Sequence, residues 1–121
     1  MECKIGYVIV GVKALESSIA FYRDVLGFEL LFSEPEFHFA SFKVGEMSFS
    51  LAEGAEETHG TGNRNTGIGF VVPDVDTAHA ELAGKGVKFT MEPGKMPWGG
   101  YMAMFVDPEG NEFYLDQAQQ Q

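Results

Sequence analysis

An internal repeat is the feature that most constrains how this chain can fold. Residues of the first half recur in the second half at nearly constant spacing. The matched pairs are Val12 with Val72, Leu15 with Val75 and Glu16 with Asp76 at an offset of 60, Gly27 with Gly86 at 59, and Phe49 with Phe113 and Leu51 with Leu115 at 64. Two degenerate copies of one module account for this pattern, and the drift in offset requires only loops of unequal length.

Each copy opens with a strand that leads into an amphipathic helix. The stretch "GYVIVGV" places its valines on one face and Tyr7 and Ile9 on the other, as expected for a β-branched strand. In "ALESSIAFYRDVLG" the apolar residues recur at helical spacing, and Gly27 is expected to end the helix in a left-handed cap. In the second copy Asp74 is the expected N-cap of the matching helix, which should end near Gly84 or Gly86.

Three further strands are expected in each copy, so the order βαβββ occurs twice. They cover residues 28–32, 37–43 and 47–51 in the first copy, and "GIGFVV" is followed after the helix by 87–90, 101–106 and 111–116 in the second. The stretch "EGAEETHGTGNRN", residues 53–65, has no large apolar residue and is expected to be a solvated linker. We predict one α+β domain over residues 1–121, with module one at 4–52 and module two at 66–117.

Two such modules would each form a curled sheet with a helix on one face. Their opposite faces would be concave, and two modules side by side would form a half-closed cup. The turn "DPEG" should direct Phe113 and Leu115 of the last strand into the core. Glu112, Tyr114 and Asp116 should then face the concave side.

Composition excludes several classes of partner. With 18 acidic and 8 basic residues the formal net charge is −10, which disfavours nucleic acid and anionic lipid. The charge fits a role in solubility as well as a role in attracting cationic ligands. The chain shows no secretory signal pattern and no long apolar run, and its lone Cys3 has no partner for an internal disulfide. We therefore expect a cytoplasmic protein without membrane association.

The segments "SSIAFYRDVLGFEL", "PDVDTAHAELAGKGVKF" and "MPWGGYMAMFVDPEGNEFYL", together with the duplication, resemble the vicinal oxygen chelate (VOC) superfamily of glyoxalase I, bleomycin resistance proteins and extradiol dioxygenases. The resemblance covers roughly residues 5–117. It implies paired βαβββ modules, a homodimer and a ligand in the cup, formed within one chain or across two. These segments are helix, cap and turn residues, so they carry the fold and not the chemistry.

The resemblance also locates four positions where metal-dependent members hold a divalent ion with His or Glu. These positions fall on Tyr7 and Gly67 in the first strands, and on Ser50 and Tyr114 in the last strands. None is a good ligand for a divalent ion, which prefers imidazole, carboxylate or thiolate. A register slip of two would introduce Glu112 or Asp116, but no His. We expect a protein without metal or other cofactor, and a binding protein in preference to an enzyme.

The expected ligand is an aromatic or cationic small molecule bound in the cup. Aromatic rings with polar handles, adaptable Met and open Gly backbone would suit such a ligand. The candidate binding residues are Tyr7, Ile9, His38, Ser48, Ser50, Gly67, Trp98, Met102, Glu112 and Tyr114. Alternatively, Tyr7 and Tyr114 fill the metal cavity and leave a packed sheet without a ligand.

Other single residues have two interpretations. His38, beside two Phe residues in an expected strand, either faces the pocket or lies at the surface. His59 is expected in the solvated linker, and His79 beside the core. Trp98 either closes over a ligand on a hinge at Gly99 and Gly100 or packs as an ordinary surface indole.

The expected function is therefore binding of the bleomycin-resistance type, in which a drug is sequestered and antibiotic resistance results. One alternative is a lyase, isomerase or dioxygenase of the same superfamily that is metal-dependent or uses Tyr114 or Glu112 as acid or base. A second alternative is an interaction protein whose cup has closed.

Overall fold

The computed structural model describes residues 1–54 and 64–118. The chain divides into two compact units, Met1–Thr61 and Gly62–Gln121. Each unit consists of one four-stranded mixed sheet and one helical segment, which confirms the predicted α+β fold of two βαβββ modules. The finer boundaries, with modules at 4–52 and 66–117 in one domain, stay a prediction.

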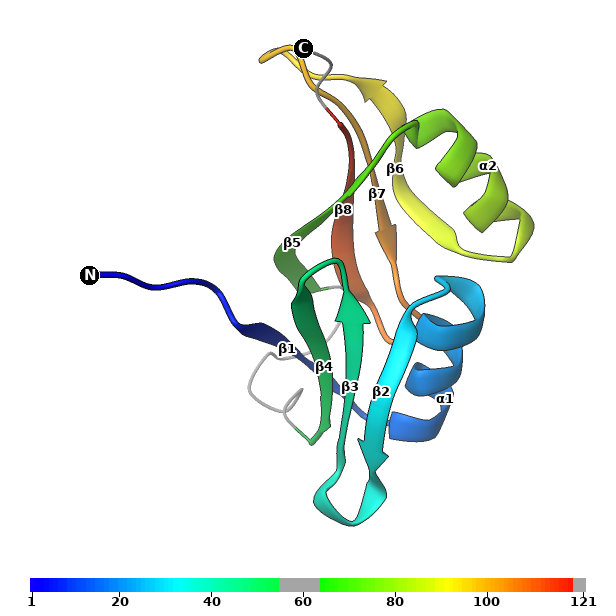
Figure 1. Cartoon of the computed structure of the whole chain (residues 1–121). Helices are drawn as coiled ribbons and strands as arrows, with labels where there is room; N and C mark the ends of the chain where they lie inside the picture. The colour runs from blue at the N-terminus through cyan, green and yellow to red at the C-terminus, as the bar shows by residue number, and fades with distance from the viewer. Residues whose placement is uncertain (55–63, 119–121) are drawn as a thin grey trace. The chain divides into compact units, whose positions relative to one another are not determined.

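The first unit is a four-stranded sheet covered on one face by a helix (Figure 1). Its elements are β1 (Tyr7–Val12), α1 (Leu15–Ala20), a π-helical turn (Phe21–Val25), β2 (Glu29–Glu34), a 3-10 turn (Pro35–Phe37), β3 (Phe39–Val44) and β4 (Met47–Glu53). The strand order is β1-β4-β3-β2, with β1 parallel to β4 and the other neighbours antiparallel.

The core of the first unit lies between this sheet and the helical segment. As predicted, Val10 and Val12 point into this core while Tyr7 and Ile9 point away from it. Tyr22 is fully buried, and its ring centroid lies 5.1 Å from that of Phe49. Burial of these large side chains on one face fixes which side of the sheet stays open.

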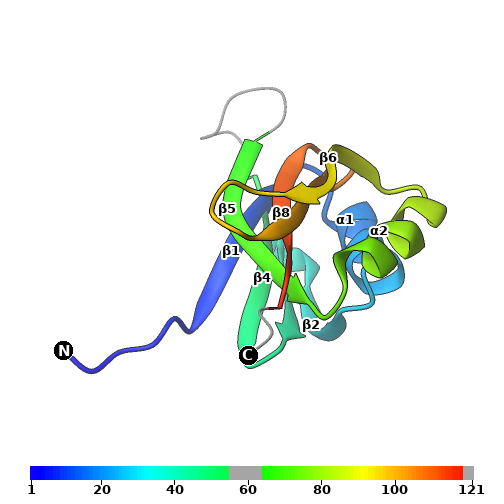
Figure 2. The ribbon, with the colours of Figure 1, turned by 90° about the horizontal axis from the view of Figure 1, so that it is seen from above.

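The second unit repeats this arrangement. Its elements are β5 (Arg64–Val72), α2 (Val75–Gly84), β6 (Lys88–Lys95), β7 (Tyr101–Val106) and β8 (Asn111–Gln117). The strand order is β5-β8-β7-β6, and α2 lies on one side of the sheet (Figure 2). Phe105, Phe113 and Leu115 form the core beneath α2.

The repeat extends to single hydrogen bonds at equivalent positions. The Leu15 N–H at the start of α1 donates a hydrogen bond to the Glu53 carboxylate at the end of β4. The Val75 N–H at the start of α2 donates one to the side-chain oxygen of Gln117 at the end of β8. Glu53 and Gln117 are 64 positions apart, as are the core pairs of the same strands. The last strand of each unit therefore secures the start of its helix.

Four local predictions were wrong, and the first three concern the first unit. His38 is not in a strand, because it follows the 3-10 turn with a left-handed φ of 58° and β3 starts only at Phe39. The first helix does not continue as an α-helix to Gly27: it widens into a π-helical turn, in which the Leu26 N–H donates to the Phe21 carbonyl. Glu53, at the predicted start of the linker, is part of β4.

The second end of the predicted linker also differs, since Arg64 and Asn65 belong to β5. The part of the linker at residues 55–63, which includes His59, lies outside the described residues. Gly27 does have the positive φ (78°) expected of a left-handed cap. Asp74 caps α2 as predicted, because its side chain accepts a hydrogen bond from the Thr77 N–H.

Candidate functional site

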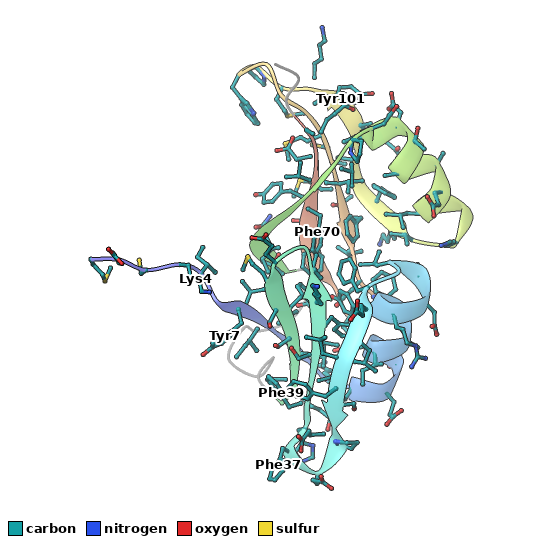
Figure 3. The ribbon with its side chains drawn as sticks, viewed as in Figure 1. Lys4, Tyr7, Phe37, Phe39, Phe70 and Tyr101 are labelled. Atoms are coloured by element: carbon teal, nitrogen blue, oxygen red, sulfur yellow. The ribbon has the colours of Figure 1, made fainter. Side chains whose placement is uncertain are left out.

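Each sheet has a face turned away from its helix, here called the first and second open faces. The first open face is formed by Tyr7 and Ile9 of β1, Ser48 and Ser50 of β4, Phe39 and Ser41 of β3, and Phe32 and Glu34 of β2. In Figure 3, Tyr7 and Phe39 lie on the side of the first sheet opposite α1. Four of the predicted site residues, Tyr7, Ile9, Ser48 and Ser50, thus share one face.

A row of paired residues crosses the first open face. Ile9 pairs with Ser50, Ser50 with Ser41, and Ser41 with Phe32. Ser50 is only 2% exposed, and its hydroxyl lies 3.2 Å from the Ser41 hydroxyl. The two hydroxyls hydrogen-bond to each other, so the centre of the row is polar and its two ends are apolar.

A hollow of about 410 Å³ opens in the first unit where β2, the 3-10 turn and β3 meet. Phe32, Glu34, Phe37 and Phe39 line this aromatic hollow. None of these four residues is among the binding residues predicted from the sequence. Alternation of Phe32 with Glu34 along β2 was a usable signal, but Phe37 was assigned to a strand and so its place beside them was missed.

The second open face is formed by residues of β5, β7 and β8. They are Asn65, Gly67, Gly69, Met102, Met104, Glu112, Tyr114 and Asp116. The predicted residues Gly67, Met102, Glu112 and Tyr114 are among them. Met102 is buried, whereas Glu112 and Tyr114 are half-buried.

A polar network joins β8, the last strand of the second unit, to the adjacent strand β5 and to β6, which lies beyond β7 in the sheet. The Asn65 amide nitrogen donates to a Glu112 carboxylate oxygen at 3.2 Å and to the Tyr114 hydroxyl at 3.1 Å. The Thr90 hydroxyl donates to the other Glu112 oxygen at 2.7 Å. Tyr114 therefore stands in a hydrogen-bonded environment and not in a purely apolar one. Asn65 is not among the residues predicted from the sequence, because it falls in the predicted linker 53–65.

A bulge in β5 places Asn65 in this network. Asn65 pairs with Glu112 and Gly69 with Tyr114, so three residues of β5 lie opposite Phe113 alone. Gly67 at the centre of the bulge has a left-handed φ of 72°, and its N–H donates to the Asn65 side-chain oxygen at 2.8 Å. Gly69, and not Gly67, is the direct neighbour of Tyr114.

The side chains at the four metal positions do not suit a divalent ion. In the first unit these are a phenol and a hydroxyl, Tyr7 and Ser50, and Ser50 already pairs with Ser41. In the second unit they are Gly67, without a side chain, and Tyr114, whose hydroxyl accepts from Asn65. Within residues 1–54 and 64–118, no three His, Cys, Asp or Glu side chains gather in a way that could hold a metal ion.

His38 and Trp98 lie on loops. The His38 ring nitrogen Nδ1 is 2.9 Å from the Glu53 carboxylate, in the turn that also carries Phe37. The Leu15 N–H and then His38 hold the pKa of Glu53 below its ordinary value of 4.5. Trp98 is 73% exposed on the β6–β7 loop, and its indole lies against the backbone of Gly100. Whether Trp98 moves on a hinge stays a prediction.

His79 flanks the core of the second unit, as predicted. It is half-buried, its ring lies edge-on to Phe89 at 4.5 Å between centroids, and its Nε2 is 2.7 Å from the Glu92 carboxylate. These contacts give His79 a structural role on α2. In the part of the chain that the structure describes, no helix is long and apolar enough to cross a membrane.

The duplicated fold agrees with comparisons to known proteins. Residues 4–115 match the model of the Glyoxalase/Bleomycin resistance protein/Dioxygenase superfamily. The chain belongs to this superfamily, which confirms the resemblance noted from the sequence. The structure of a superfamily member from Sphaerobacter thermophilus is similar with a TM-score of 0.84 and 29% identity, covering 97% of this chain and 98% of that one.

Two further similar proteins differ in what their names describe. The crystal structure of TnmS3, an antibiotic binding protein from Streptomyces sp., has a TM-score of 0.83 and 30% identity and covers 98% of both chains. A probable lactoylglutathione lyase from Synechocystis sp. is 31% identical over 121 residues, which is 92% of each chain. The family is therefore established, and its members similar to this chain include both a binder and an enzyme.

Proposed function

We propose that this chain is a metal-free binding protein that sequesters an aromatic or cationic small molecule at the open faces of its sheets. The observation that carries the proposal is the set of side chains at the four metal positions. Tyr7, Ser50, Gly67 and Tyr114 supply no imidazole, carboxylate or thiolate, and Ser50 and Tyr114 are already hydrogen-bonded within their own units. The similarity to the antibiotic binding protein TnmS3 supports a role in binding.

The side chains of the first open face suit contact with an organic ligand. Tyr7 and Ile9 are exposed, although the Tyr7 ring and the Ile9 side chain are large and apolar. Aromatic rings give broad contact at a small cost in side-chain entropy. On the second open face, Glu112 adds negative charge beside the Tyr114 ring.

The first test is metal analysis of the purified protein combined with a thermal-shift screen of cationic and aromatic compounds. A ligand at a hundred times its Kd adds about 2.7 kcal/mol to the free energy of unfolding, so a binder should raise the melting temperature clearly. Tyr7→Ser should weaken the binding of a hit, and Ile5→Ser, an exposed apolar residue just before β1, is the matched control. A stoichiometric transition metal, or a broad panel without any stabilising compound, would contradict the proposal.

A second candidate is catalysis by Glu112 and Tyr114. The hydrogen bonds from Asn65 and Thr90 hold a carboxylate beside a phenol, an arrangement suited to proton transfer, and the probable lactoylglutathione lyase is a relative. The test is consumption of lactoylglutathione by the wild type and by Glu112→Gln. Asp116→Asn, on the same face of the same strand, is the control. Turnover that is lost only in Glu112→Gln would favour the enzyme.

We further propose that the protein is cytoplasmic, forms a homodimer and contributes to antibiotic resistance. The similarity to the antibiotic binding protein TnmS3 supports the role in resistance, and the homodimer is what the superfamily resemblance implies. Native mass spectrometry of protein isolated from its host would report the dimer mass together with any bound small molecule. Deletion of the coding sequence should then lower the drug concentration that the host tolerates, and an unchanged tolerance across the bound compounds would contradict the role in resistance.

A further inference from the structure

The aromatic hollow of the first unit has a well-defined arrangement of rings. Phe32 on β2 and Phe39 on β3 lie with their ring centroids 6.1 Å apart and their planes tilted by 31°. Glu34 pairs directly with Phe39 across the two strands. Phe37 completes the wall from the 3-10 turn (Figure 3). Three phenyl rings and one carboxylate therefore border a volume of about 410 Å³.

The rings of the hollow are largely outside the core. Phe37 is 73% exposed and Phe32 is 46% exposed, whereas Phe42 and Phe49 of the same sheet are buried beneath α1. Phe rings grouped at the surface around a hollow are typical of a binding site, since scattered single residues would not form a wall. Among the residues that the structure describes, none forms a hydrogen bond or ion pair with the Glu34 side chain.

The chemistry of this wall selects a particular kind of ligand. The faces of phenyl rings attract cations, and the Glu34 carboxylate attracts positive charge while repelling anions. A single carboxylate does not supply enough ligands for a metal ion. A primary ammonium has three N–H donors, which would lose their hydrogen bonds to water in the hollow, and of the lining side chains only Glu34 could replace them. A tertiary or quaternary ammonium group carries its charge behind methyl or methylene groups, so it matches both the apolar rings and the carboxylate.

We infer that the aromatic hollow binds the tertiary or quaternary ammonium group of a small organic molecule. This inference rests on the proposed function and names the chemical class of its ligand. Glu34 neutralises the charge, and the rings of Phe32, Phe37 and Phe39 contact the alkyl groups. The net charge of −10 raises the local concentration of such cations without selecting among them.

The test is an NMR titration of the intact protein with choline and with its neutral isostere 3,3-dimethylbutan-1-ol, at about 0.15 M salt where exposed charges are screened. Choline should shift the amide signals of residues 37–39, and its methyl protons should move upfield because they lie over the rings. The isostere should bind about five-fold more weakly, since it lacks the charge. Equal affinity for the two compounds would overturn the inference.

Matched variants separate the hollow from general electrostatic attraction. Glu34→Gln should weaken choline binding by about five-fold, whereas Glu36→Gln removes an equal charge from the adjacent turn and should leave it unchanged. Phe37→Ala should reduce the upfield shift, and Leu31→Ala, an exposed apolar residue of β2 outside the hollow, should not. Equal losses in Glu34→Gln and Glu36→Gln would overturn the inference.

The outcomes also distinguish the inference from the proposed function. If choline causes no shifts but an aromatic compound from the thermal screen binds in a Tyr7-dependent way, the ammonium site is wrong and the binding function stands. If neither choline nor any compound of the panel binds, both are wrong. If choline binds as described and its affinity follows Glu34, both are supported.

Discussion

At the scale of single residues, the two helices start differently although their modules are copies. Asp74 caps α2 itself, with its side chain 3.2 Å from the Thr77 N–H. The equivalent residue before α1 is Ala14, which has no side-chain oxygen. Glu53 of β4 accepts from the Leu15 N–H at 2.8 Å, as Gln117 of β8 accepts from the Val75 N–H of α2. Helix α2 therefore has a local cap in addition to the contact from its last strand, whereas Ala14 supplies no such cap to α1.

This difference predicts the effect of substitutions at Asp74. Asp74→Ala should lower the free energy of unfolding by about 1 kcal/mol, because the Thr77 N–H loses its acceptor. Asp74→Asn should retain most of the stability, since an amide oxygen also caps a helix. Urea denaturation of the three proteins measures the effect. An Asp74→Asn variant as unstable as Asp74→Ala would show that charge, and not the cap, is responsible.

Glu53 predicts a pH dependence with a definite sign. The Leu15 N–H and His38 lower its pKa in the folded chain below 4.5, so its contribution to stability is present above pH 4.5 and is lost as the pH falls through the folded value. Glu53→Gln should therefore lower the melting temperature near pH 7, and the difference from wild type should shrink below pH 4.5. Glu46→Gln, in the exposed turn between β3 and β4, is the control. A difference that grows on acidification would contradict this prediction.

At the scale of elements, the bulge in β5 is the feature that shapes the second open face. It places two extra residues in β5 between the pairs Asn65–Glu112 and Gly69–Tyr114, and the Asn65 amide donates to both Glu112 and Tyr114. The bulge depends on the left-handed conformation of Gly67, which other residues adopt only at a cost. Gly69, two residues further along β5, does not have a positive φ.

Gly67→Ala should therefore destabilise the protein by about 1 kcal/mol. Gly69→Ala should be nearly neutral, because an added Cβ would lie 3.5 Å from the Tyr114 Cβ, an ordinary contact. Chemical denaturation gives the stabilities, and backbone amide spectra should show the changes of Gly67→Ala concentrated in β5 and β8. If Gly69→Ala is the more damaging variant, the assignment of the bulge to Gly67 is wrong.

Elements whose signals are local could be predicted from the sequence, and those that depend on distant contacts could not. The alternation in β1, the Asp74 cap and the Gly27 cap follow from neighbouring residues, and all three are confirmed. The π-helical turn and the β5 bulge could not be located from the sequence, because both depend on which backbone groups pair, and the two extra residues of the bulge leave the alternation of side chains along β5 unchanged. The aromatic hollow was missed because residues 37–43 were predicted to be a strand, whereas Phe37 lies in the 3-10 turn that starts at Pro35.

At the scale of the whole molecule, duplication has preserved the framework and let the open faces diverge. Equivalent strands supply equivalent core residues, and Glu53 and Gln117 secure the two helices in the same way. The open faces do not match: the first carries serine hydroxyls and phenyl rings, the second an Asn–Glu–Tyr network. Because core packing and helix caps maintain the fold, the side chains of the open faces can differ between members of the family. The family alone therefore does not determine this chain's function.

The net charge of −10 also acts on the whole molecule, and it predicts opposite effects of salt on folding and on binding. Raising NaCl from about 0.01 M to about 0.15 M shortens the screening length from about 30 Å to about 8 Å. Repulsion among carboxylates in the folded chain then weakens, so the melting temperature should rise. Over the same interval the affinity for choline should fall, whereas that for a neutral aromatic compound should not change. Parallel melting and titration series measure both trends, and a choline affinity independent of salt would mean that the net charge does not contribute to choline binding.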